Sequence, residues 1–166
     1  MRFDLFISYS RRDNHQGLHK LIRLSKRATV CLSYAWADCQ AADAIRRALM
    51  AHELTVTSPE DFGASTQPFH AVVTKAIDDA IERGFVLVLM SPVSLASRWV
   101  KNETEYALGL AARSQRSNVI PVVIQPFPPD ALPPQRANIQ WFNLTTGPFE
   151  ERVEELIRSL KTREME

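Results

Sequence analysis

Short β-rich runs alternate with helical stretches along most of this chain, and this alternation limits the fold more than any other feature. The runs are mostly continuous stretches of apolar residues, at positions 29–33, 54–57, 85–90, 119–124 and 139–144. A continuous apolar run is typical of a strand buried on both faces, as in a parallel sheet that its crossover connections cover. The sequence therefore predicts an α/β domain built on five parallel strands.

Apolar residues at helical spacing predict four helices between and after these strands. The first helix begins next to Asp38, which we expect to act as its N-cap. The other three are expected near residues 69–80, 99–112 and 149–160. Gly84 is expected to separate the second helix from the third strand.

Proline is expected to make two places irregular. Pro121 has no N–H for a sheet hydrogen bond, so we expect the fourth strand either to be interrupted at Pro121 or to begin there. The segment 126–138 contains five of the ten prolines, which leaves little room for a full helix. We therefore expect an irregular connection to the fifth strand.

Size and charge narrow the class of protein. The 166 residues suit a single domain. The chain has 20 Lys and Arg against 19 Asp and Glu, so no overall charge favours nucleic acid or a membrane surface as a partner. The longest apolar run is far too short to span a bilayer, and the two cysteines lack a metal-binding spacing. We expect a cytoplasmic protein with no metal site.

The opening motif occurs twice: FDLFISYSRRD at 3–13 and ATVCLSYAWAD at 28–38 share Ser, Tyr and Asp at corresponding positions. Because the second copy leads into a helix and a strand at normal spacing, we assign it as the first strand of the sheet. The domain then spans 28–166, and residues 1–27 form an N-terminal extension, an added strand and helix on a sheet edge or against another subunit. Two alternatives stay open: a duplication without function, and a functional first strand formed by the first copy.

Glu103 occupies an unusual place for a charged residue. On a helical wheel, the residues within roughly 60° of it are apolar or aromatic: Trp99, Val100, Tyr106, Ala107 and Leu110. A buried carboxylate is costly unless it is paired, hydrogen-bonded or protonated. Three explanations are open: a partner such as Arg98 or a backbone donor, a solvent-facing rim position, or a functional role.

The opening motif and a later segment, which begins in the third predicted strand, resemble Toll/interleukin-1 receptor (TIR) domains. FISYSRRD and LSYAWAD resemble the opening box of the family, and VLVLMSPVSLASRWVKNETEYAL resembles the later segment of its bacterial members. The similarity extends over about residues 28–160. It implies a flavodoxin-like parallel sheet in the order 2-1-3-4-5, with helices on both faces and ligands at the carboxyl ends of the strands.

The resemblance implies two functions of different kinds. Many enzymatic members are NAD+ nucleosidases, hydrolases that release nicotinamide from NAD, and some cyclise the remainder. Bacterial members of this kind act in antiviral defence or cell-death signalling and are activated by self-association; NAD is their substrate and no separate cofactor is implied. The alternative is a non-catalytic interaction module, a signalling scaffold that docks other TIR domains.

The resemblance assigns Glu103 as the catalytic residue, because Trp99 and Glu103 reproduce the Trp-x-x-x-Glu pattern of the family. A fixed anion stabilises the positive charge that develops on the ribose as the bond to nicotinamide breaks. Trp36, Tyr34 and Trp99 are the candidates for holding the cationic nicotinamide ring, with core packing as the alternative for Tyr34 and Trp99. Asp38 completes the expected substrate contacts of the opening box.

The loop SPEDFGASTQP, residues 58–68, follows the second predicted strand. By resemblance it borders the NAD site and carries contacts for self-association. Glu60 and Asp61 are candidates for binding ribose hydroxyls, or else are solvated loop acids. At Ala35 and Trp36 the chain departs from several enzymatic members, which carry basic residues there.

Overall fold

The computed structural model describes residues 28–62, 69–128, 131 and 140–164, and the structural statements below refer to these residues. Five strands form one sheet: β1 (Thr29–Ser33), β2 (Thr55–Thr57), β3 (Gly84–Met90), β4 (Val119–Val123) and β5 (Phe142–Asn143). Their order is β2-β1-β3-β4-β5, and every neighbouring pair is parallel. The predicted flavodoxin-like sheet in the order 2-1-3-4-5 is confirmed.

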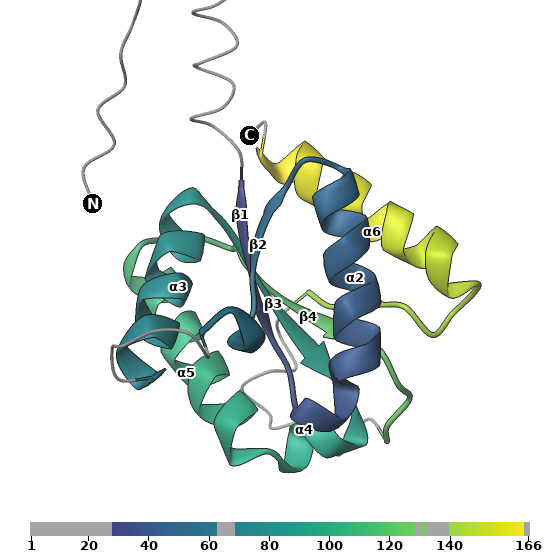
Figure 1. Ribbon diagram of the computed structural model, residues 1–166, viewed down its shortest axis with the longest axis horizontal. Helices are drawn as coiled ribbons and strands as arrows, with labels where there is room; N and C mark the ends of the chain where they lie inside the picture. Colours follow the sequence, from purple (N-terminus) through teal and green to yellow (C-terminus); the bar gives the residue numbers. More distant parts are fainter. Residues whose placement is uncertain (1–27, 63–68, 129–130, 132–139, 165–166) are drawn as a thin grey trace, which may run out of the picture.

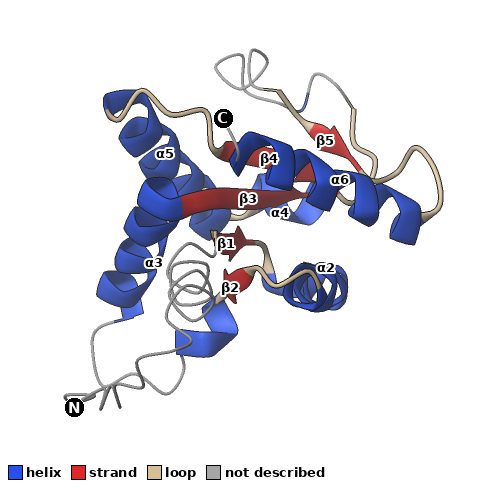
Figure 2. Cartoon of the chain, turned by 90° about the horizontal axis from the view of Figure 1, so that it is seen from above, coloured by secondary structure: helices blue, strands red, loops and turns tan. Residues whose placement is uncertain are grey.

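Helices cover both faces of this sheet. The helical elements are η1 (Trp36–Asp38), α2 (Cys39–Ala51), η2 (Pro59–Phe62), α3 (Phe69–Arg83), α4 (Pro92–Ala96), α5 (Arg98–Arg113) and α6 (Phe149–Glu164). Figure 1 and Figure 2 show α2 and α6 on one side of the strands and α3 and α5 on the other. This three-layer arrangement buries both faces of the strands, which is why their sequences read as continuous apolar runs.

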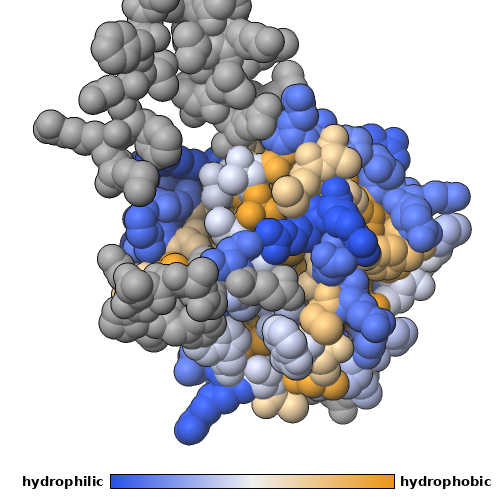
Figure 3. Space-filling model, in the orientation of Figure 1, coloured by the Kyte–Doolittle hydropathy of each residue, from blue (hydrophilic) through white to orange (hydrophobic). Residues whose placement is uncertain are grey.

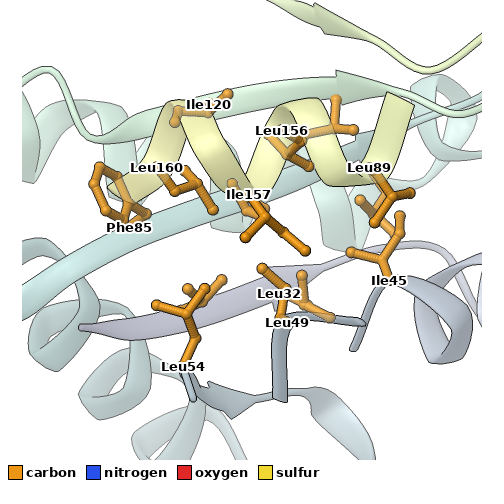
Figure 4. Close-up of a cluster of buried hydrophobic side chains, with 14 of the residues drawn as sticks. Leu32, Ile45, Leu49, Leu54, Phe85, Leu89, Ile120, Leu156, Ile157 and Leu160 are labelled. Carbon is orange, nitrogen blue, oxygen red and sulfur yellow. The ribbon is translucent and has the colours of Figure 1, made fainter. Parts of the chain in front are cut away.

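The core divides into two clusters, one on each face of the sheet. Leu32 of β1 packs with Ile45 of α2 and Ile157 of α6 on one face, as Figure 4 shows. Cys31, the preceding residue, belongs to the other cluster, beneath α3 and α5. The opposite placement of adjacent residues follows from the two-residue period of a strand. Burial of a large apolar side chain such as Leu32 contributes about 1.5 to 3 kcal/mol.

The fourth strand runs through Pro121, so the prediction that it is interrupted or begins there is wrong. Pro121 lies in the middle of β4 and pairs in register with Val88 of β3. Ile124 directs its N–H to β3, whereas Val123 directs its carbonyl to β5, so odd-numbered residues of β4 face β5. The described pairing with β5 begins only opposite Val122. Proline therefore lacks an N–H on the side of β4 that faces β5, at a position where no pairing with β5 is described. No hydrogen bond of the described ladder is lost.

Gly84 directly follows the last residue of α3, so the helix ends where the sequence predicts, but the strand begins one residue earlier than expected and Gly84 is the first residue of β3. It pairs with Thr29 of β1, and a Cβ built on Gly84 lies 2.0 Å from the carbonyl oxygen of Thr29. The two backbones approach too closely for any side chain. Glycine is therefore required at this position by packing and not by a turn.

Two predictions fall outside the described residues: the added strand and helix of the extension 1–27, and the irregular connection through 132–139. Within the sheet that is described, the second copy of the opening motif supplies β1.

The outer sides of α2 and α6 are largely hydrophilic (Figure 3). No helix in the described part of the chain is both long and apolar enough to cross a membrane.

Candidate active site

The carboxyl ends of the parallel strands bring together polar residues that are far apart in the sequence. Ser33 is the last residue of β1, Ser58 follows β2, and Ser91 follows β3. All three are buried. Because parallel strands end at one edge of the sheet, these serines lie along the same edge, where doubly wound α/β proteins bind ligands.

Glu103 reaches this edge from α5. The helix begins after Ser97, whose side chain accepts a hydrogen bond from the N–H of Val100 and caps the first turn. Glu103 lies on the buried face of α5 and is 8% exposed. The wheel therefore places Glu103 correctly, whereas Tyr106 is 38% exposed and donates a hydrogen bond to Asp78 instead of joining the apolar face.

The carboxylate of Glu103 has one hydrogen-bond partner in the described structure. Its Oε2 accepts a hydrogen bond from the hydroxyl of Ser33, and its Oε1 is buried with no partner. Arg98, the partner considered from sequence, is exposed and makes no ion pair with it. Glu103 is thus a buried acid that no described cation neutralises.

Burial is the main cause of the altered protonation of Glu103. It raises the pKa of this carboxyl to about 7, and the hydrogen bond from Ser33 acts in the opposite direction. Cys31 lies on the same face of β1 as Ser33, since the two residues are two positions apart. Burial and the charge of Glu103 raise the pKa of the Cys31 thiol to about 12, so the thiol is neutral at physiological pH. Because the pKa of Glu103 itself is about 7, this side chain is a mixture of acid and carboxylate at neutral pH.

Asp38 has a different role from the one expected at a helix N-cap. It occupies the N-cap position of α2, but its side chain makes no capping hydrogen bond. Its buried carboxylate instead accepts a hydrogen bond from the hydroxyl of Ser91, at 2.7 Å. Ser91 in turn caps α4 through reciprocal hydrogen bonds with Ser94. The hydrogen bond between Asp38 and Ser91 therefore links the segment that follows β1 to the segment that follows β3, at the carboxyl edge of the sheet.

The three aromatic candidates lie in different environments. Trp36, in η1, is 75% exposed, so its ring is open to a ligand. Tyr34 is buried in the cluster beneath α2 and α6, on the opposite face of the sheet from Cys31 and Ser33. Trp99 is half-buried against the cluster beneath α3 and α5, one helical turn before Glu103. The fold therefore separates Tyr34 from the side on which Glu103 lies.

The loop after β2 is held by an ion pair. Asp61 accepts a hydrogen bond from Arg46 of α2 at 2.7 Å and another from the backbone N–H of Ser58 at 2.8 Å. The same arginine donates to the Ser58 hydroxyl at 2.9 Å. The carboxylate of Asp61 is thus engaged with the protein, while the side chain of Glu60 and residues 63–68 lie outside the described structure.

Sequence reasoning missed the contacts of Ser33 and Ser91. A signal was present, since Ser33 and Asp38 are two of the positions that the repeated opening motif shares. Their partners, Glu103 and Ser91, belong to later segments, and only the folded chain brings them together. Among the described residues, no three His, Cys, Asp or Glu side chains gather closely enough to hold a metal ion.

The parallel sheet in the order 2-1-3-4-5, with helices on both faces, makes this protein a flavodoxin-like α/β domain. It carries a buried carboxylate next to the carboxyl end of its first strand. Within that class, the family model for TIR domains matches residues 30–157, so the chain belongs to the TIR domain family. A comparison with curated proteins gives no match.

Solved structures show the same fold at low sequence identity. The TIR domains of the activated Roq1 resistosome, which recognises the pathogen effector XopQ, match with a TM-score of 0.67 and 16% identity over 80% of this chain and 98% of that one. The TIR domain of the Toll-related receptor TRR-2 from Hydra magnipapillata matches with a TM-score of 0.60 and 16% identity over 82% and 98%. A metazoan TIR-STING receptor from C. gigas, in complex with 2',3'-cGAMP, matches with a TM-score of 0.61 and 22% identity over 79% of this chain and 38% of that one.

Proposed function

We propose that this TIR domain is an NAD+ nucleosidase with Glu103 as its catalytic residue. The observation that carries the proposal is the carboxylate of Glu103, which is buried behind the carboxyl edge of the sheet, held by Ser33 through one oxygen and without a partner at the other. Buried, unpaired acids are costly, and strongly perturbed acids concentrate at functional sites. The Trp-x-x-x-Glu resemblance supports the same assignment.

The chemistry needs one well-placed anion. When the bond between ribose and nicotinamide breaks, its electron pair goes to the ring nitrogen, and nicotinamide leaves as a neutral molecule. The positive charge that develops on the sugar is oxocarbenium-like, and an adjacent carboxylate stabilises it most strongly where water is excluded. Water then adds to the sugar carbon and loses a proton. The exposed ring of Trp36 is the candidate for stacking on the nicotinamide before it leaves.

The buried position of Glu103 gives the proposal a conformational requirement. The unpartnered Oε1 is shielded from solvent, so a substrate reaches it only after neighbouring side chains shift. Self-association of TIR domains is the event that we propose to open the site, in the manner of the bacterial members that act in defence and cell-death signalling. A structurally similar TIR domain is part of an assembly that is described as activated, the Roq1 resistosome.

The test measures nicotinamide release from NAD by concentrated or artificially clustered protein. Removing the anion in Glu103→Gln is expected to reduce the rate by about a hundredfold or more, the usual effect of deleting an electrostatic stabiliser. Glu105→Gln is the matched control, because Glu105 lies two residues away on the exposed side of the same helix. The control is expected to retain the wild-type rate.

A docking module is the second candidate, and the exposed apolar side chains of Trp36 and Val93 favour it. They come from η1 and α4, which contact each other at the carboxyl edge. Exposed apolar residues on neighbouring elements mark a surface for association where they form a contiguous patch. Equal, background nicotinamide release by clustered wild-type and Glu103→Gln protein would leave docking as the function.

A further inference from the structure

A cavity of about 640 Å³ lies at the amino edge of the sheet, the opposite end from Ser33 and Glu103. The starts of β3 and β4 form its floor, and the end of α6 lies at the same end of the molecule (Figure 1). Its polar lining includes Arg83, Arg116, Arg163, Asn118, Gln140 and Glu82. A volume of this size suits a small-molecule ligand.

The three arginines of this cavity make few contacts with the protein. Arg116 donates one hydrogen bond, to the backbone carbonyl of Glu82. Arg163 donates two, to the carbonyl of Ser117 and to the side-chain oxygen of Gln140. Arg83 donates none to a described group. All these acceptors are neutral, and most of the guanidinium N–H groups have no acceptor among the described residues.

Arginines elsewhere in the described structure differ among themselves: Arg98, Arg113 and Arg158 lie on exposed helix surfaces and form no ion pair with a described residue, whereas three others do. Arg46, Arg47 and Arg152 each form an ion pair with a carboxylate of their own neighbourhood. Among the described residues of the lining, Glu82 supplies the only carboxylate, and its side chain forms no ion pair with a described residue. The described lining therefore has an excess of positive charge that no described carboxylate neutralises.

The ends of helices explain only part of this arrangement. Carbonyl groups at helix carboxyl ends attract cations, which accounts for the hydrogen bond that Arg116 donates to the carbonyl of Glu82 in the last turn of α3. Arg163 instead donates to the carbonyl of Ser117, in the connection between α5 and β4. Arg83, the last residue of α3, makes no such bond. Remaining donors on three guanidinium groups suit an anion with several acceptor oxygens, which arginine binds through charge-assisted hydrogen bonds.

A second cavity of about 390 Å³ adjoins the first and differs in chemistry. The two share Arg116 and Arg163, but the second is also lined by apolar residues, among them Leu108, Ala111 and Val119. The pair of cavities thus offers an anion-binding part next to an apolar part. This combination matches a small molecule that carries a phosphate group and a flat apolar ring.

We propose that these joined cavities bind a small phosphorylated molecule, with its phosphate among Arg83, Arg116 and Arg163 and its ring against Leu108 and Val119. The site lies at the opposite edge of the sheet from Glu103 and does not depend on the proposed cleavage of NAD. Asn118 lines the same cavity, and its Nδ2 donates to the carbonyls of Ile81 and Gly84, so its side-chain amide is a fixed local probe of binding.

Calorimetric titration of the full chain with two probes tests the proposal. Ribose 5-phosphate presents the phosphate on a sugar without a ring system for the apolar part, and adenosine monophosphate adds an aromatic ring to the same sugar phosphate, so the second is expected to bind more tightly. Arg116→Gln and Arg163→Gln keep N–H donors but lose the charge, and each is expected to weaken binding of both probes by about tenfold or more. Arg158→Gln removes an exposed arginine of α6 outside the cavities, and it is expected to leave binding unchanged.

Nuclear magnetic resonance separates this site from the edge that holds Glu103. Binding is expected to shift the side-chain amide signals of Asn118, and Glu103→Gln is expected to bind the probes as the wild type does. The proposal is overturned if the cavity variants and Arg158→Gln bind equally, if the shifts occur around Ser33 instead of Asn118, or if neither probe binds. Binding to anionic vesicles without binding to the free probes would also overturn it.

Discussion

The hydroxyl of Ser33 donates a hydrogen bond to Oε2 of Glu103, a residue 70 positions further along the chain. This contact joins the end of β1 to the first half of α5 and leaves Oε1 of the same carboxylate without a partner. A hydrogen bond to the charged form favours ionisation, whereas burial opposes it. The protonation of Glu103 near neutral pH therefore depends on Ser33.

The pH dependence of nicotinamide release should report this balance. Ionised Glu103 is the active form, so kcat/KM of clustered protein is expected to rise with pH through about 7, the pKa of Glu103. Ser33→Ala removes the hydrogen bond that lowers this pKa, so its profile is expected to shift to higher pH. Ser33→Thr keeps a hydroxyl and is expected to keep the wild-type profile.

The same titration can be followed without activity, by the carbon-13 signal of the Glu103 carboxyl group. Identical titration midpoints in wild type and Ser33→Ala would show that Ser33 does not control the protonation of Glu103. A shifted midpoint without any nicotinamide release would leave the contact established and the enzymatic proposal refuted.

Protein stability should also depend on pH through Glu103. Its folded-state pKa of about 7 exceeds the ordinary value of 4.5, so the folded chain holds this proton more tightly than the unfolded chain. Stability is therefore lost as pH rises between these two values, by about 2 to 3 kcal/mol. Glu103→Gln cannot titrate, so its free energy of unfolding relative to wild type is expected to increase by this amount between about pH 5 and about pH 8. Urea unfolding at each pH measures the difference, with Glu105→Gln as control; a pH-independent difference would contradict the assignment.

Trp36 should affect substrate binding and not folding. Because its side chain is 75% exposed, Trp36→Ala is expected to change the free energy of unfolding by less than about 0.5 kcal/mol. Loss of stacking on the cationic nicotinamide is expected to raise KM about tenfold. Trp36→Phe should recover much of the loss, and Val93→Ala, an exposed apolar change on α4, should leave KM unaltered. An unchanged KM in Trp36→Ala would remove Trp36 from the site.

Two glycine substitutions should have opposite effects on stability. Gly84→Ala places a methyl group 2.0 Å from the carbonyl oxygen of Thr29, so β1 and β3 must separate, at a cost of at least about 2 to 3 kcal/mol. Gly109→Ala lies within α5, where the nearest atom to the new methyl is 3.7 Å away. Alanine favours a helix by up to about 1 kcal/mol over glycine, so this variant is expected to be more stable than wild type. Thermal or urea unfolding compares them, and a neutral Gly84→Ala would show that the strands are not so close.

The pattern of the sequence was sufficient for the parallel sheet with its helices, and the resemblance to TIR domains implied the strand order, but neither revealed the local exceptions. Pro121 appeared to break a strand because a sequence does not reveal which side of the strand a missing N–H faces. Gly84 was correctly predicted to follow a helix, but its close contact with Thr29 could not be predicted, because Thr29 lies in a strand more than fifty positions away. The helical wheel placed Glu103 on the buried face of its helix, but it also placed Tyr106 there. A wheel contains no information about how much of the helix surface the neighbouring elements cover.

The sequence by itself determined the alternation of strands and helices, the parallel sheet and the apolar face of the helix on which Glu103 lies, because apolar periodicity is a local property of the chain. The structure decided that this position is buried and not at a solvent-facing rim. Tertiary structure alone decided that Ser33 holds Glu103, that Ser91 holds Asp38, and that Tyr34 lies on the other face of the sheet from Ser33. Those relationships join segments that are distant in sequence, and they depend on strand register and helix placement, which only the packing of the whole core fixes.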